Sequence, residues 1–145
     1  MRSSNFRVPQ GGLIDRARPI TFSFDGKIYT GYAGDSLAAA LLAHGVHLVG
    51  RSFKYHRPRG IFSAGSEEPN ALVNVGEGAY ATPNCKATEI EIFDGMIARS
   101  QHGWPSIQFD ILALFNFFSP LLSAGFFYKT FIGPGRHAWQ FYEKF

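Results

Sequence analysis

Residues 20–45 read ITFSFDGKIYTGYAGDSLAAALLAHG, and this stretch decides the fold. Apolar and polar residues alternate on both sides of Asp25-Gly26, a dipeptide that is typical of the two-residue turn in a β-hairpin. Either Gly34-Asp35 or Ser36 offers a helix cap, leucines recur after it at helical spacing, and Gly45 follows as a helix stop. The sequence therefore predicts a hairpin over residues 20–33 and then an amphipathic helix of about 10 residues.

Two further strands are expected later in the chain, at residues 71–75 and 87–93, and the second runs into the turn dipeptide Asp94-Gly95. A hairpin, a helix laid across it and later strands that return to the same sheet form the order of a β-grasp domain. We therefore expect an α+β fold with this domain over residues 19–103, preceded by an N-terminal extension over residues 1–18.

The composition changes at Trp104, where an apolar C-terminal arm over residues 104–145 begins. These 42 positions hold 13 of the 23 aromatic residues (15 Phe, 2 Trp and 6 Tyr) and only five charged side chains. Residues 111–128 carry no charge and are long enough to span a membrane, but Pro120 divides them into two pieces that are each too short. We expect a largely helical arm that packs on another part of the protein or on a partner, and no membrane insertion.

Composition and charge exclude several classes of protein. A chain with 46% hydrophobic and 16% aromatic residues is not a disordered solvating chain. The net charge of +3 is unevenly distributed, with nine Lys/Arg against three Asp/Glu in residues 1–59 and five against eight in residues 60–145. A single Cys excludes an internal disulfide framework and a Cys-rich metal site. Residues 1–13 lack the apolar core of a signal peptide, so a cytoplasmic location is expected.

A basic segment lies at residues 51–59, where positive charges alternate with aromatic rings. Such a pattern suits phosphate binding, stacking on nucleic-acid bases or contact with an acidic partner. The alternative is a solvated loop whose arginines pair with Glu67 and Glu68, and both interpretations stay open at this point. The candidate binding residues are Arg51, Lys54, His56, Arg57 and Arg59.

No catalytic residue is predicted. Residues 76–81 (GEGAYA) match a dinucleotide-binding pattern, but Thr82-Pro83 follow where the pattern requires a helix, so we expect a loop between strands. His44 and His47 are separated by Gly45 and have no completing ligand nearby, so no metal site is predicted. The sequence contains no recognisable nucleophile–base arrangement, paired catalytic carboxylates or phosphate-binding loop.

Four stretches carry a family resemblance. They read GRSFKYHRPRGIFSAGSEEPNALVNV (50–75), GGLIDRARPITFSFDGK (11–27), GDSLAAALLAHGV (34–46) and PNCKATEIEIFDG (83–95). They resemble the N-terminal region of the alpha subunit of heterotetrameric sarcosine oxidase, and the aromatic arm is similar as well. The resemblance implies a ferredoxin-like β-grasp domain of the 2Fe–2S type.

Related cluster-bearing domains of amine and opine dehydrogenases carry C-x4-C-x2-C before a strand that begins Leu-Val, and a fourth Cys later. When the Leu-Val of those domains is aligned with Leu72-Val73, their first three Cys positions correspond to Ser63, Glu68 and Ala71. Cys85 approximates the position of the fourth. A cluster held by four thiolates cannot form on one Cys. The resemblance therefore implies a ferredoxin fold that has lost its redox centre.

The resemblance also implies the larger setting of the chain. This would be an accessory, non-catalytic domain of a flavoenzyme complex that demethylates sarcosine to glycine, with formaldehyde or methylene-tetrahydrofolate and hydrogen peroxide as the other products. NAD would be held by the remainder of the alpha subunit, and FAD and FMN mainly with the beta subunit. The partners of this chain would be the remainder of the alpha subunit and the beta, gamma and delta subunits.

The arm would then supply contacts to the next domain. The interface residues expected are Phe117, Phe118, Leu121, Phe126, Phe127 and Phe131. Two other functions remain as alternatives: a small 2Fe–2S electron-transfer subunit, and a basic nucleic-acid-binding module that uses residues 51–59.

Overall fold

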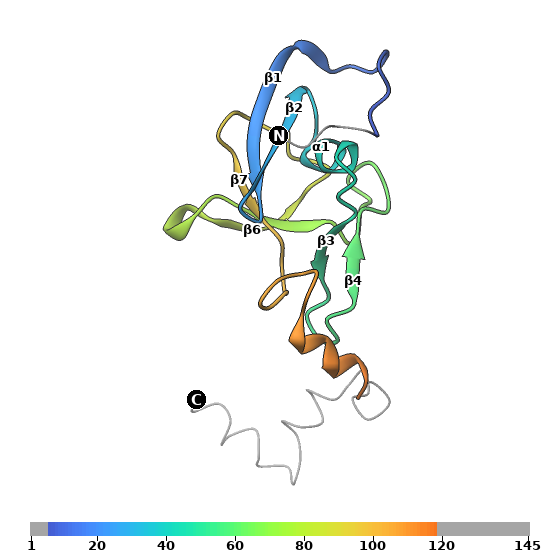
Figure 1. Cartoon of the computed structure of the whole chain (residues 1–145), viewed down its shortest axis with the longest axis vertical. Helices are drawn as coiled ribbons and strands as arrows, with labels where there is room; N and C mark the ends of the chain where they lie inside the picture. Colours follow the sequence, from blue (N-terminus) through green and yellow to red (C-terminus); the bar gives the residue numbers. More distant parts are fainter. Residues whose placement is uncertain (1–5, 119–145) are drawn as a thin grey trace.

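The computed structural model describes residues 6–118, and it is mostly β-sheet with one short α-helix. Figure 1 shows α1 beside the β1–β2 hairpin, and β3 and β4 extending away from them toward the last described turns. The elements are β1 (Asp15–Phe24), β2 (Lys27–Ala33), α1 (Leu37–Ala43), β3 (Leu48–Arg51), β4 (Pro58–Gly60), β5 (Leu72–Val75), η1 (Gly78–Tyr80), β6 (Thr82–Lys86), β7 (Ile97–Arg99) and η2 (Ile111–Asn116).

The strands form two sheets. The larger has the order β2-β1-β7-β5-β6, and the smaller contains β3 and β4. Strands β1 and β7 run parallel, whereas the other paired strands are antiparallel. A hairpin, a helix and a last strand returning beside the first one are consistent with the expected ferredoxin-like β-grasp arrangement.

The β1–β2 hairpin confirms the turn predicted at its tip. Asp25 and Gly26 have φ angles of 49° and 72°, the two positive values that a type I′ turn requires. The tip sets a register in which Phe22 lies opposite Tyr29, and the two rings stack. The turn chemistry therefore fixes which side chains of the hairpin face the core.

Helix α1 lies between Ser36 and Gly45, as the sequence predicted, but it has seven residues rather than about ten. The Ser36 hydroxyl accepts a hydrogen bond from the Ala39 N–H at 3.2 Å, and Gly45 has a φ angle of 72° after the last turn. Leu37 and Leu41 are fully buried against the sheet. Each contributes on the order of 2 kcal/mol of hydrophobic stabilisation.

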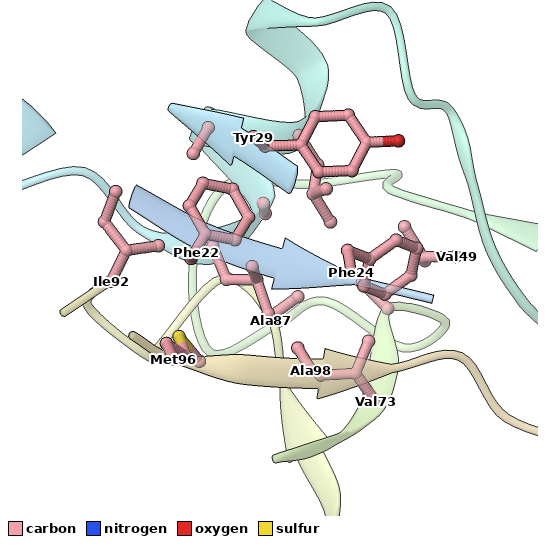
Figure 2. Packing of buried hydrophobic residues seen from close by; sticks show 14 residues of the cluster. Phe22, Phe24, Tyr29, Val49, Val73, Ala87, Ile92, Met96 and Ala98 are labelled. Atoms are coloured by element: carbon pink, nitrogen blue, oxygen red, sulfur yellow. The ribbon is translucent and has the colours of Figure 1, made fainter. Parts of the chain in front are cut away.

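Figure 2 shows the core between the sheet and the helix. Phe22 and Phe24 of β1 point into it, and β5 and β7 of the same sheet contribute Val73 and Ala98. The aromatic residues of the hairpin thus share one core with smaller side chains from β5 and β7.

The strand predicted at residues 87–93 is wrong. The carbonyls of Ala87 and Ile90 instead accept hydrogen bonds from the N–H groups of Ala38 and Leu37 at the start of α1. The Ile92 N–H donates to the Asp35 carbonyl. The backbone of this segment therefore satisfies the helix start rather than a sheet partner.

Strands β6 and β7 flank that segment and were not predicted. Pro83 lies within β6, which is an edge strand, where a residue without an N–H is tolerated. The expected loop at residues 76–81 is confirmed, because it joins β5 to β6 and contains only the short turn η1.

Candidate functional site

The loop at residues 61–71 joins β4 to β5 and contains the positions compared with cluster ligands. Its centre is the carboxylate of Glu68, whose side chain is buried with only 1% of the residue exposed. Glu68 Oε2 accepts hydrogen bonds from the N–H groups of Phe62 and Ser63 and from the Ser63 hydroxyl. Oε1 accepts from the Asn70 N–H at 2.7 Å.

The surroundings of Glu68 favour its charged form. Burial raises the pKa of this carboxyl group, but hydrogen bonds from the backbone N–H groups of Ser63, Asn70, Phe62 and Ala71 outweigh burial and leave the pKa below 4.5. Glu68 is therefore an anion at neutral pH, held by the backbone of its own loop.

These residues do not fit an iron–sulfur cluster. At the three compared positions, Ser63 donates hydrogen bonds to the Glu68 carboxylate, and Ala71 is fully buried and has only a methyl group as its side chain. Cys85 is the single Cys of the sequence and lies on β6, where its Cα is paired with that of Val73. Four thiolates are needed and one is present.

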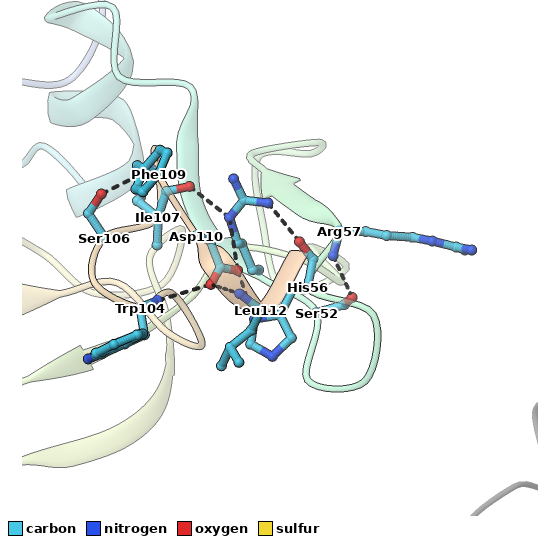
Figure 3. Close-up of polar contacts among 10 residues, drawn as sticks. Ser52, His56, Arg57, Trp104, Ser106, Ile107, Phe109, Asp110 and Leu112 are labelled. Carbon is cyan, nitrogen blue, oxygen red and sulfur yellow. Dashed lines mark hydrogen bonds and ion pairs between the residues drawn. The ribbon is translucent and has the colours of Figure 1, made fainter. Parts of the chain in front are cut away.

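A second buried carboxylate lies at Asp110, where the segment after β7 meets the β3–β4 hairpin (Figure 3). Its side chain is fully buried. His56 Nδ1 donates to Asp110 Oδ2 at 2.8 Å, and Arg51 Nε lies 3.4 Å from the same oxygen. The other oxygen accepts from the N–H groups of Trp104 and Leu112.

Arg51 joins the two sides of this cluster through backbone carbonyls. Its Nε donates to the Ile107 carbonyl and its Nη1 to the His56 carbonyl, each at 2.7 Å. Burial raises the pKa of Asp110, but the hydrogen bonds from Trp104, His56 and Leu112 and the charge of His56 together lower it below 3.8. We call Arg51, His56 and Asp110 the Asp110 cluster; it fastens residues 104–112 to the hairpin.

The structure divides the basic segment in two. Arg51 and His56 are largely buried in the Asp110 cluster, so their pairing partner is Asp110 rather than Glu67 or Glu68. Arg57 and Arg59 are exposed, and each donates to an amide oxygen, that of Asn116 and Asn70 respectively. Lys54 lies 5.0 Å from the centre of the Tyr55 ring.

Asp110 was missed by the sequence analysis, although it carried a signal. It is the lone charge between Trp104 and Lys129, directly before the charge-free run. A second missed contact is the two-point ion pair between Arg7 and Asp35, at 2.9 and 2.7 Å, which joins the N-terminal extension to the turn before α1. Both pairs are long-range, and sequence spacing does not indicate such partners.

The described residues hold no group of three or more His, Cys, Asp or Glu side chains that could bind a metal ion. His44 Nε2 donates to the Thr30 carbonyl at 2.7 Å, and His47 contacts the Phe6 ring. Within residues 6–118, no helix is long and apolar enough to cross a membrane.

The first part of the aromatic arm is partly buried and partly exposed. Ile107 is 1% exposed, whereas Phe117 and Phe118 are 85% and 52% exposed. An open pocket lined by Phe109, Ile111 and Leu114, among others, lies beside them. The other predicted interface residues, Leu121, Phe126, Phe127 and Phe131, lie outside the described residues.

Known proteins resemble this chain in sequence and in structure. Residues 17–103 match the family described as "2Fe-2S iron-sulfur cluster binding domain". Sarcosine oxidase subunit alpha of Rhizobium meliloti (strain 1021) is 56% identical over 140 residues, which cover 97% of this chain and 14% of that protein. Sarcosine oxidase subunit alpha of Corynebacterium sp. (strain U-96) is 43% identical over 91 residues, covering 61% of this chain and 9% of that protein.

Among solved structures, L-proline dehydrogenase from P. horikoshii matches with a TM-score of 0.50 and 29% identity, over 62% of this chain and 16% of that chain. The chain thus spans only a small part of the length of the relatives it matches. It belongs to the 2Fe–2S iron–sulfur cluster binding domain family and is homologous to the N-terminal region of the sarcosine oxidase alpha subunit.

Proposed function

We propose that this chain is a structural, accessory domain of a sarcosine oxidase-type flavoenzyme complex and is not catalytic by itself. The observation that carries the proposal is the identity of 56% over 140 residues, which extends past the family match at residue 103 and into the aromatic arm. The complex would demethylate sarcosine oxidatively to glycine, with formaldehyde or methylene-tetrahydrofolate and hydrogen peroxide as products.

In this proposal, the β-grasp domain covers residues 19–103 and the arm from Trp104 contacts the rest of an alpha-type subunit. Exposed Phe117 and Phe118 support such a role, because leaving large apolar side chains in water costs about 25 cal/mol per Å². The burial of Ile107 and the contact of Asp110 with His56 support an arm whose first residues are fastened to the domain, before the exposed Phe117 and Phe118. NAD, FAD and FMN would be bound by the other parts of the complex.

The two alternative functions have weaker support. An electron-transfer subunit needs thiolates at positions where this chain has Ser63, Glu68 and Ala71. A nucleic-acid-binding module needs its cations at the surface, whereas Arg51 and His56 are engaged with Asp110. The basic segment remains a proposed partner contact through Arg57 and Arg59.

A chimeric subunit tests the proposal. The region of the Rhizobium meliloti alpha subunit that matches this chain is replaced by this chain, and the chimera is produced with the other subunits of that enzyme. We expect an assembled complex that forms hydrogen peroxide from sarcosine. A matched chimera with Phe117→Ser and Phe118→Ser should assemble less completely. A chimera that is folded but does not assemble would contradict the proposal.

A further inference from the structure

The loop at residues 61–71 contains the positions compared with cluster ligands, in a chain whose residues there are not thiolates. In cluster-binding loops, backbone N–H groups turn inward toward an anionic centre, and hydrogen bonds to the cluster sulfurs form part of the site. In the 61–71 loop the N–H groups of Phe62, Ser63 and Asn70 converge in the same way, and without an anion they would have no acceptor. Each such group costs about 1–3 kcal/mol.

Glu68 supplies the missing acceptors. Its two oxygens together receive the N–H groups of Phe62, Ser63 and Asn70 and the Ser63 hydroxyl. An ionised carboxylate offers about four acceptor positions, so this one side chain satisfies donors from both ends of the loop. Glu68 also stands at the middle one of the three positions compared with thiolate ligands.

Cations do not balance this charge directly. Two cationic side chains donate hydrogen bonds to the loop: Arg59 to the Asn70 amide oxygen and Lys86 to the Ser66 carbonyl. Among the described residues, Glu68 itself forms no ion pair, and neighbouring Glu67 is exposed. Backbone dipoles therefore hold the Glu68 carboxylate, as they would hold a buried anionic group bound in the loop.

We infer that the carboxylate of Glu68 replaces the iron–sulfur cluster as the anion that organises the 61–71 loop. The side chain occupies the hydrogen-bonding role of the absent group and makes the loop independent of iron. This inference rests on the contacts of Glu68 and the family match, and it holds whether or not the complex oxidises sarcosine.

Hydrogen–deuterium exchange on the full chain tests the inference. The amides of Phe62, Ser63 and Asn70 should be protected in the wild-type protein. Glu68→Gln removes the charge at nearly constant shape and turns an N–H₂ group toward these donors, so we expect their exchange to accelerate by more than tenfold. Amides of β1 serve as an internal reference and should change less.

Glu67→Gln is the matched control, because it removes the same charge one residue away from an exposed position. It should leave the exchange of the loop amides unchanged. Glu68→Asp keeps a carboxylate and should restore part of the protection that Glu68→Gln loses. If Glu68→Gln does not fold while Glu68→Asp and Glu67→Gln do, the inference is supported. Unchanged protection in Glu68→Gln overturns it, as does an equal loss in Glu67→Gln.

Discussion

The two buried carboxylates of this protein are both ionised, yet they stabilise different kinds of structure. Glu68 binds donors that lie within six residues of it, all in one loop. Asp110 binds His56 and Arg51, which are 54 and 59 residues away in sequence. Glu68 therefore stabilises a loop whose residues are already close in sequence, whereas Asp110 holds together two segments that are far apart in sequence.

This difference has an energetic consequence. Loss of Glu68 exposes backbone donors that water can reach if the loop opens, so the damage stays local. Loss of Asp110 leaves a guanidinium group and an imidazole buried without their anion, and they cannot be solvated unless the hairpin and the 104–112 segment separate.

Asp110→Ala should give the largest effect. Removal of one partner from a buried charged cluster typically costs about 3–5 kcal/mol, and we expect a loss of free energy of unfolding of that size. Urea unfolding at neutral pH measures it. The control is Glu89→Ala, which breaks the exposed ion pair with Lys86 and should cost less than about 1 kcal/mol. Equal effects of the two substitutions would mean that the cluster does not hold the segment in solution.

The same contrast explains what the sequence could predict. The hairpin tip at Asp25-Gly26 and the start of α1 follow from neighbouring residues, so short patterns place them, and the structure then selects Ser36 over Gly34-Asp35 as the helix cap. The wrong strand at 87–93 has strand-like alternation, but its carbonyls are used by the start of α1, about fifty residues earlier. The Glu68 position was found through family spacing, whereas its hydrogen bonds depend on how the loop folds.

Short sequence patterns do not predict which residues pair when they are far apart in the chain. The basic segment at 51–59 was correctly noticed as a cluster of charge, but its sequence does not say which cations face inward. Arg51 and His56 turn toward Asp110, whereas Arg57 and Arg59 remain exposed. The choice is made by tertiary contacts, and only a structure shows it.

Low pH should weaken both the Glu68 loop and the Asp110 cluster, and we expect it to lower the free energy of unfolding by less than Asp110→Ala does. The pKa values of Glu68 and Asp110 lie below the ordinary values of these side chains, so at low pH the unfolded chain binds more protons than the folded chain. Their contribution to the free energy of unfolding is therefore complete above about pH 5 and is lost as the pH decreases through the folded pKa values.

Urea unfolding at pH 7 and at pH 3 measures this dependence. Glu68→Gln and Asp110→Asn should each lose less stability between the two pH values than the wild type, because one of the responsible groups no longer titrates. Glu67→Gln should behave like the wild type. A pH dependence that is equally steep in all four proteins would show that other groups dominate it.

Iron and sulfide should have the smallest effect of all. Anaerobic reconstitution of the purified wild-type chain is expected to leave it colourless, because Ser63, Glu68 and Ala71 offer no thiolate and the Glu68 carboxylate already uses the inward N–H groups. A ferredoxin domain with all four Cys ligands, treated side by side, shows whether the chemistry works. If the chain develops stable visible charge-transfer absorption with iron and sulfide in stoichiometric amounts, the loop can still hold a cluster. Glu68 would then have to leave its hydrogen bonds to make room, and the distinction between a self-sufficient loop and a cofactor-dependent one would fail for this protein.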